Sequence, residues 1–279
     1  MKIYYGFTGK VLLTLGIDID QTSKHKVLMS VLRHSTPFLI FLCSLQLVFS
    51  FIFEKADDFM NLEALCTTFF TIQSLIKNLT VVINQKKLSS LRNRLNILFE
   101  TFDNDEKTKS LIYLRRIRNI CYKLFVWAMI VIWSINLLPL ITMFYSYVVG
   151  SKVVRSFPYQ MWYPFYSFSY YFSVYFYNLY VGQIFMISQI IMDHYFVLIV
   201  FDLVAHFDQL GEKFQIVINE ASEETSVENR KRFKTLIENH AALIDISDEL
   251  NKVYGIALLV LVLTSSFIVA VVGFIITVS

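Results

Sequence analysis

Glycine, proline and cysteine are scarce in this chain. Of its 279 residues only 8 are glycine, 4 are proline and 3 are cysteine. Because glycine and proline punctuate turn-rich β folds, their scarcity favours long helices. The cysteines are Cys43, Cys66 and Cys121, and they have no CxxC spacing. They predict neither a disulfide framework nor a zinc site, and we expect small buried hydrophobic side chains.

Motifs of catalysis and nucleotide binding are also missing. The sequence contains no GxGxxG, GxxxxGK[ST], HExxH or GxSxG. Asp202 and His206 stand four residues apart, but no two histidines have a metal-binding spacing. The net charge is only +3, and no basic arm is typical of a nucleic-acid partner. An enzyme, a cofactor and a nucleic-acid partner therefore have no support in the sequence.

Apolar residues are abundant instead. Hydrophobic residues make up 56% of the chain and aromatic residues 16%, and the mean hydropathy is +0.54. Soluble domains usually hold about 45–50% apolar residues. A helix needs about 20 mostly apolar residues to span a bilayer. Five segments meet this length and predict an all-α membrane protein, a bundle of transmembrane helices near 35–53, 62–83, 124–149, 165–192 and 255–278.

The second of these segments is unusually polar. It carries Glu63 near one end and Lys77 near the other, with three threonines, a glutamine and a serine between them. Uncharged polar groups in lipid cost free energy unless they are hydrogen-bonded. We therefore expect this face to contact other helices or a water-filled cavity. A long amphipathic soluble helix is the alternative.

The positions of lysine and arginine predict the orientation. Three regions, 1–34, 84–123 and 193–254, hold 21 of the 25 cations. The opposite side holds only Lys55, Lys152 and Arg155, and cytosolic loops carry the excess of positive charge. The pattern places the N-terminus in the cytosol and makes 1–34 a cytosolic N-terminal segment.

Apolar stripes at helical spacing run through the two larger cytosolic regions. Each stripe indicates one buried helix face. No proline lies between Phe165 and Glu220, which predicts that the fourth span continues as one helix, roughly 80 Å long, into the cytosol. The stripes are Leu88, Leu91, Leu95, Leu98 and Phe102; Leu203, Phe207, Leu210, Phe214 and Val217; and Leu243, Ile246, Leu250 and Val253.

Aromatic residues are concentrated between Phe157 and Tyr177. Trp162 and Tyr163 suit the outer membrane interface, where amphipathic aromatic side chains gather. The tyrosines one to three turns deeper are not explained by such a belt, because a buried tyrosine hydroxyl needs a partner. An aromatic ligand pocket and plain packing are both consistent with this density.

Three stretches of the chain resemble the insect odorant receptors. They are the loop with Phe157-Pro158-Tyr159 and Trp162-Tyr163-Pro164-Phe165, the exit of the fourth span, and the approach to the fifth. The exit reads Asp193-His194-Tyr195-Phe196, then Asp202-Leu203, His206-Phe207 and Leu210-Gly211; the approach has Glu238-Asn239-His240, Val253-Tyr254 and Ser265-Ser266. The order of these features and the N-inside topology carry the resemblance.

This resemblance implies a subunit of an odorant-gated cation channel in the plasma membrane of olfactory neurons. The implied role is the ligand-binding, tuning subunit, which pairs with the family's shared co-receptor as a hetero-oligomer, expected to be a tetramer. Its ligand would be a small, volatile, mostly apolar odorant. The family has two further spans, the last of which lines the pore, so the sequence is expected to be C-terminally truncated. A non-conducting remnant and a gustatory-receptor-like chemosensory subunit are the alternatives.

The resemblance and the orientation together select candidate ligand contacts. Only the outer halves of the second, third and fourth spans can contribute. Aromatic side chains would supply shape, while Gln73 and Asn178 would supply hydrogen bonds. The candidates are Phe69, Phe70 and Gln73; Trp133, Leu137 and Ile141; and Tyr171, Val174, Tyr175 and Asn178.

Overall fold

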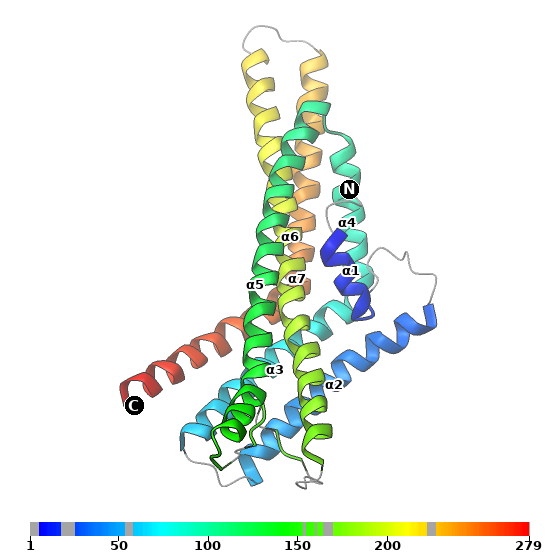
Figure 1. The fold of residues 1–279 in the computed structure, drawn as a ribbon. Coiled ribbons are helices and arrows are strands. Elements are labelled where there is room, and N and C mark those ends of the chain that lie inside the picture. The colour runs from blue at the N-terminus through cyan, green and yellow to red at the C-terminus, as the bar shows by residue number, and fades with distance from the viewer. Residues whose placement is uncertain are drawn as a thin grey trace.

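The described part of the chain is all-helical, as predicted. The computed structural model describes residues 6–17, 26–53, 58–152, 155–159, 161–163, 170–221 and 227–278. Five helices among these residues are long and apolar enough to cross a membrane. The helices, shown in Figure 1, are α1 (Gly6–Thr14), α2 (Lys26–Phe53), α3 (Asp58–Ile83), α4 (Gln85–Glu100), α5 (Asn104–Val148), α6 (Tyr171–Ala221) and α7 (Val227–Val278).

Helices α5, α6 and α7 are much longer than a membrane span, and α5 has 45 residues. Helix α6 runs unbroken for 51 residues, which confirms the predicted continuation of the fourth span. Helix α7 joins the third apolar stripe to the fifth span in one helix of 52 residues. Helix α2 begins at Lys26, nine residues before the predicted span, and contains Pro37. The predicted start of the fourth span, at Phe165, lies outside the described residues.

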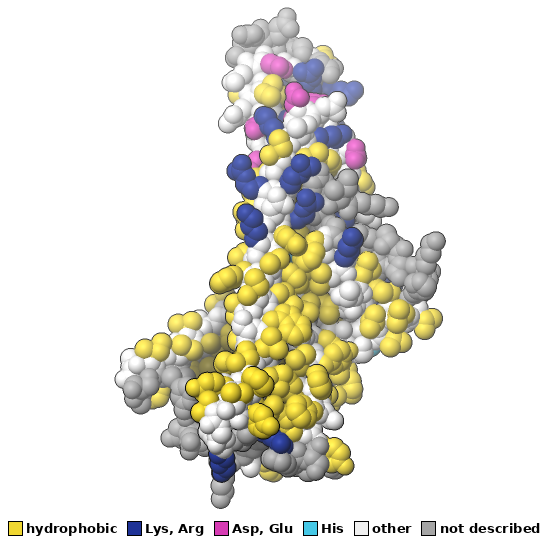
Figure 2. Space-filling model, viewed as in Figure 1, with side chains coloured by type: hydrophobic (Ala, Val, Ile, Leu, Met, Phe, Trp, Pro, Cys, Tyr) yellow, Lys and Arg dark blue, Asp and Glu magenta, His cyan; other side chains and the backbone are white. Residues whose placement is uncertain are grey.

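The long helices divide the molecule into two halves of different surface chemistry. Figure 2 shows charged side chains gathered over the half that contains the adjacent ends of α6 and α7. The other half is covered by apolar side chains, with a few cations at its far end. We call these the charged half and the apolar half. That the charged half is cytosolic and the apolar half lies in the membrane stays a prediction.

The predicted stripes of the charged half pack against one another around one core. Alternation at 3 and 4 residues places each stripe on a single helix face, so the three helices can bury them together. This confirms the predicted packing. The buried members are Leu88, Leu91 and Leu95 of α4, Leu203, Leu210 and Val217 of α6, and Leu243, Ile246, Leu250 and Val253 of α7.

Polar contacts complete the charged half. The buried His206 ring lies between two backbone carbonyls, with Nδ1 2.7 Å from the oxygen of Asp202 and Nε2 3.1 Å from that of Leu95. It therefore links α6 to α4. At the surface, the Arg94 guanidinium of α4 lies 2.7 Å from the Asp245 carboxylate and 3.4 Å from the Glu249 carboxylate of α7.

The apolar half is held together partly by polar contacts of α3. The Ser74 hydroxyl donates to the Phe185 carbonyl at 3.3 Å, and the Asn78 amide donates to the Ser188 hydroxyl at 3.0 Å. Ser74, Asn78 and Ser188 are completely buried. The polar face of the second span therefore contacts other helices, as expected from the cost of exposing it to lipid.

Helix α1 packs against both halves through a tight turn. Gly16 follows α1 with φ +81°, a left-handed conformation that favours glycine. A Cβ at this position would overlap the backbone of Leu32 and Arg33 in α2. The turn places Leu12 and Ile17 in the core of the charged half. A larger residue at position 16 would therefore both strain the turn and separate α1 from α2.

Candidate functional site

The loop between α5 and α6 folds back onto the apolar half. The Trp162 amide donates to the Gln46 carbonyl of α2 at 3.2 Å, and the Trp162 ring lies 5.6 Å from those of Phe49 and Phe53. The ring of Tyr159 lies so close to α6 at Gly182 that a Cβ would overlap it. The loop is thus inserted between α2 and α6 at the end of the molecule away from the charged half.

Two candidate residues on α6, Tyr171 and Asn178, bond to this loop. The Tyr171 hydroxyl donates to the Ser156 carbonyl at 2.9 Å. The Asn178 amide donates to the Tyr159 carbonyl at 2.8 Å and to the Tyr163 hydroxyl at 2.7 Å. Their i, i+4 and i+7 spacing explains why Tyr171, Tyr175 and Asn178 share one buried face.

Helix α5 contacts the same cluster of α6 residues through Asn136. The Tyr175 hydroxyl donates to the Asn136 backbone carbonyl, and both residues are fully buried. Neither atom of the Asn136 side-chain amide has a hydrogen-bond partner of good geometry among the described residues. The Asn178 Oδ1 atom also has no partner among these residues, whereas the Tyr159 hydroxyl lies beside the Asn136 amide. Buried polar atoms are normally hydrogen-bonded, so this region has capacity left for a bound group.

Burial also perturbs the Tyr159 hydroxyl in the loop. Loss of solvation raises its pKa to about 12, while the nearby Asn136 amide partly offsets the rise. Deprotonation is disfavoured because the charged form would be stranded in an apolar setting. The Tyr159 hydroxyl therefore keeps its proton and can donate a hydrogen bond.

The candidates on α3 lie against α7 rather than against this cluster. The Gln73 amide donates to the Thr264 hydroxyl and lies 3.4 Å from the Ser265 hydroxyl. The Phe69 ring lies 4.7 Å from that of Phe267. Phe70 is 43% exposed. The structure therefore groups these residues with the fifth span, apart from Tyr171 and Tyr175.

The candidates on α5 are on its outward side. Trp133, Leu137 and Ile141 are 43%, 40% and 60% exposed. The buried residues of this part of α5 are instead Ile132, Asn136 and Pro139. The side chains of consecutive residues point in directions about 100° apart around a helix. A residue one position away from a buried residue can therefore be exposed.

Sequence reasoning missed several members of the site. Asn136 is a polar residue within an apolar span, and that isolation is a signal for an interior contact. Tyr159 and Tyr163 belong to the aromatic stretch between Phe157 and Tyr177. The sequence has no periodic pattern there that would predict that the loop packs back against the helices. Gln46 of α2, whose side-chain oxygen accepts from the Tyr177 hydroxyl at 3.2 Å, was also missed. Among the described residues no group of three or more His, Cys, Asp or Glu could hold a metal.

One solved protein with this arrangement is an insect olfactory receptor. OR5 from Machilis hrabei matches with a TM-score of 0.77 and 18% identity, over 97% of this chain and 70% of that one. The same receptor in complex with eugenol matches with a TM-score of 0.76 and 17% identity, over 98% of this chain and 71% of that one. These matches show a shared fold.

Sequence comparison gives the same assignment. Odorant receptor 85c of Drosophila melanogaster is 25% identical over 215 residues, which cover 75% of this chain. The chain spans about half, 54%, of that relative's length. The family profile described as 7tm odorant receptor matches residues 60–279, most of the chain. It is a family of multi-pass membrane receptors and not of enzymes. The chain therefore belongs to the 7tm odorant receptor family, in agreement with its helical architecture and with the resemblance seen in its sequence.

Proposed function

We propose that this chain is the ligand-binding, tuning subunit of an odorant-gated cation channel in the plasma membrane of olfactory neurons. It would work with a co-receptor subunit and would take a small, mostly apolar odorant. Family membership supports the receptor role, and the eugenol complex of the Machilis receptor supports a small aromatic ligand. The charged half would lie in the cytosol, together with the N-terminus, as the distribution of cations favours.

One observation carries the proposal, namely the buried cluster between the returning loop and helices α5 and α6. It combines the aromatic rings of Tyr171 and Tyr175 with the buried polar side chains of Asn136, Tyr159 and Asn178, of which the Asn178 Oδ1 atom has no hydrogen-bond partner among the described residues. Rings give an odorant shape complementarity and dispersion, while a few polar groups fix its orientation. We place the odorant here. This choice keeps the α6 candidates Tyr171, Tyr175 and Asn178, leaves out the half-buried Val174, and adds Asn136 and Tyr159.

The test is odorant-evoked calcium entry in cells that express this chain together with a co-receptor. Eugenol is the first probe, within a panel of small aromatic and aliphatic odorants. The double substitution Tyr171→Ala/Tyr175→Ala should shift the half-maximal concentration by about ten- to a hundredfold, equivalent to about 1–3 kcal/mol. Asn136→Leu should weaken only ligands that carry a hydrogen-bonding group. Tyr122→Phe, on an exposed tyrosine of α5, is the matched control.

Surface biotinylation must show equal receptor levels for every variant. An unchanged odorant profile of Tyr171→Ala/Tyr175→Ala at normal surface level would place the ligand elsewhere. Trp133→Ala then tests the outward side of α5. A response lost in this variant alone would favour the candidate set Trp133, Leu137 and Ile141 over the buried cluster.

Epitope tags test the orientation separately. A tag at Asn104, in the charged half, should be read only after permeabilisation, whereas a tag at Lys152 should be read on intact cells. The two sites bracket α5 and therefore report on opposite ends of one helix. Surface staining of the Asn104 tag would reverse the proposed topology without affecting the ligand site.

A further inference from the structure

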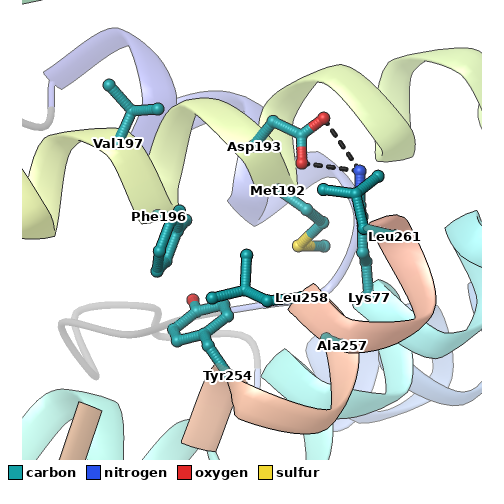
Figure 3. Close-up of a pocket in the computed structure, with 9 residues that line it drawn as sticks. All are labelled: Lys77, Met192, Asp193, Phe196, Val197, Tyr254, Ala257, Leu258 and Leu261. Carbon is teal, nitrogen blue, oxygen red and sulfur yellow. Dashed lines mark hydrogen bonds and ion pairs between the residues drawn. The ribbon is translucent and has the colours of Figure 1, made fainter. Parts of the chain in front are cut away.

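A cavity lies far from the returning loop, between α3, α6 and α7. Its volume is about 210 Å³, and Figure 3 shows the side chains around it. Phe196, Ala257 and Leu258 form apolar parts of its wall, while Lys77, Asp193 and Tyr254 bring polar atoms to it. Met192, another lining residue, is 14 residues beyond Asn178 on α6, which corresponds to about 21 Å along a helix. This cavity is therefore separate from the proposed odorant site.

The charges at this cavity neutralise each other. The Lys77 ammonium lies 2.7 Å and 2.9 Å from the two oxygens of the Asp193 carboxylate. The Lys77 side chain is only 8% exposed, whereas that of Asp193 is 47% exposed. A charged ligand would have to compete with this internal ion pair, so the cavity favours a neutral one.

Tyr254 provides a buried polar group without a partner among the described residues. The residue is 5% exposed, and its hydroxyl has no hydrogen-bond partner among the described residues. Its ring lies 4.8 Å from that of Phe196, and in Figure 3 the hydroxyl points between Phe196 and Leu258. A buried hydroxyl without a partner is unfavourable, and a ligand oxygen would satisfy it.

We propose that this cavity binds a small neutral molecule with one ring and one carbonyl or ether oxygen, which accepts a hydrogen bond from Tyr254. The apolar walls hold the ring, and the volume exceeds the roughly 150 Å³ cavity known to bind benzene. The site joins α3 to the region where α7 passes from the charged half into the apolar half (Figure 1). Occupancy would brace these three helices, independently of the proposed odorant site.

Photolabelling locates the site in the 279-residue chain reconstituted into nanodiscs. The probe is 4-azidoacetophenone, an aromatic ketone, and labelled peptides are mapped by mass spectrometry. The expected result is saturable labelling of peptides that contain Met192–Val197 or Tyr254–Leu261, suppressed by excess acetophenone. Cumene has the shape of acetophenone without its oxygen, and it should compete about five- to tenfold less well because it cannot accept a hydrogen bond.

Two variants decide the outcome. Tyr254→Phe keeps the ring but removes the hydroxyl, so the advantage of acetophenone over cumene should disappear, while the control Tyr122→Phe should retain it. Ala257→Phe should fill the cavity and abolish saturable labelling; if it fails to fold, the Tyr254→Phe comparison still decides. Non-saturable labelling spread over lipid-facing residues would overturn the proposal. So would saturable labelling confined to another site, or an acetophenone preference that persists in Tyr254→Phe.

Discussion

The charged and apolar halves of the molecule use opposite arrangements of side chains. In the charged half, the leucine and isoleucine stripes of α4, α6 and α7 form the core, and ion pairs such as Arg94–Asp245 lie at the surface. In the apolar half, polar side chains such as Gln73 and Asn78 join helices internally, while apolar side chains cover the outside. The medium explains the difference, because water favours apolar burial and lipid offers no partner for an exposed polar group.

The largest expected effect is the loss of a core leucine in the charged half. Leu95 of α4 is completely buried. Leu95→Ala should destabilise the chain by about 2–5 kcal/mol, from lost apolar contacts and the cavity left behind. Ile97→Ala on the same helix, where Ile97 is 66% exposed, is the control and should change stability far less. Thermal unfolding of the purified chain in detergent measures both, and equal costs would contradict the assigned core.

An intermediate effect is expected from the ion pair at the boundary of the halves. Asp193→Asn leaves the ammonium of Lys77 buried without its counter-charge, and breaking a buried pair costs about 3–5 kcal/mol. We expect less, about 1–3 kcal/mol, because Asp193 itself is half-exposed and water screens part of the interaction. The double variant Lys77→Met/Asp193→Leu should recover much of this loss, because no charge remains unpaired. A double variant as unstable as Asp193→Asn would show that packing, rather than charge, dominates here.

A smaller effect is expected from a single polar contact within the apolar half. Asn78→Leu removes the hydrogen bond to Ser188 between α3 and α6. Such bonds in membrane bundles contribute about 0.6 kcal/mol on average and rarely more than about 1.7 kcal/mol. Asn84→Leu, a half-buried asparagine at the end of α3 that bonds only within its own turn, is the control. Thermal unfolding in matched lipid nanodiscs gives the two differences, and a cost above 3 kcal/mol would exceed what one such bond explains.

Much of this two-part arrangement could be predicted from the sequence. Stripes such as Leu243, Ile246 and Leu250 depend only on helical periodicity, so their burial followed from local spacing. The inward face of α3 followed from the cost of polar groups in lipid. Both predictions depend on a property of one helix and its surroundings, without knowledge of how other segments dock.

The candidate site was harder to predict because it depends on how separate helices and a loop pack against one another. Three candidate positions on α6 form a buried face, but Trp133 and Leu137 lie one position away from the α5 residues Ile132 and Asn136 that are buried. A span that is apolar on all sides carries little information about its rotation. The return of Tyr159 between α2 and α6 depends on a loop, whose path has no sequence period.

The smallest expected effect comes from the surface ion pair of the charged half, and it completes the comparison. The Arg94 and Asp245 side chains are 32% and 60% exposed, so water solvates both charges with or without the contact. Asp245→Asn should therefore cost between about 0 and 1 kcal/mol, well below Asp193→Asn. Because the screening length falls from about 10 Å at 0.1 M salt to about 3 Å at 1 M, any cost should vanish at high salt, whereas that of Asp193→Asn should largely persist. Thermal unfolding of both variants across a salt series measures the loss of stability. If the two variants lost the same stability with the same dependence on salt, the surroundings of the two ion pairs would not differ as described.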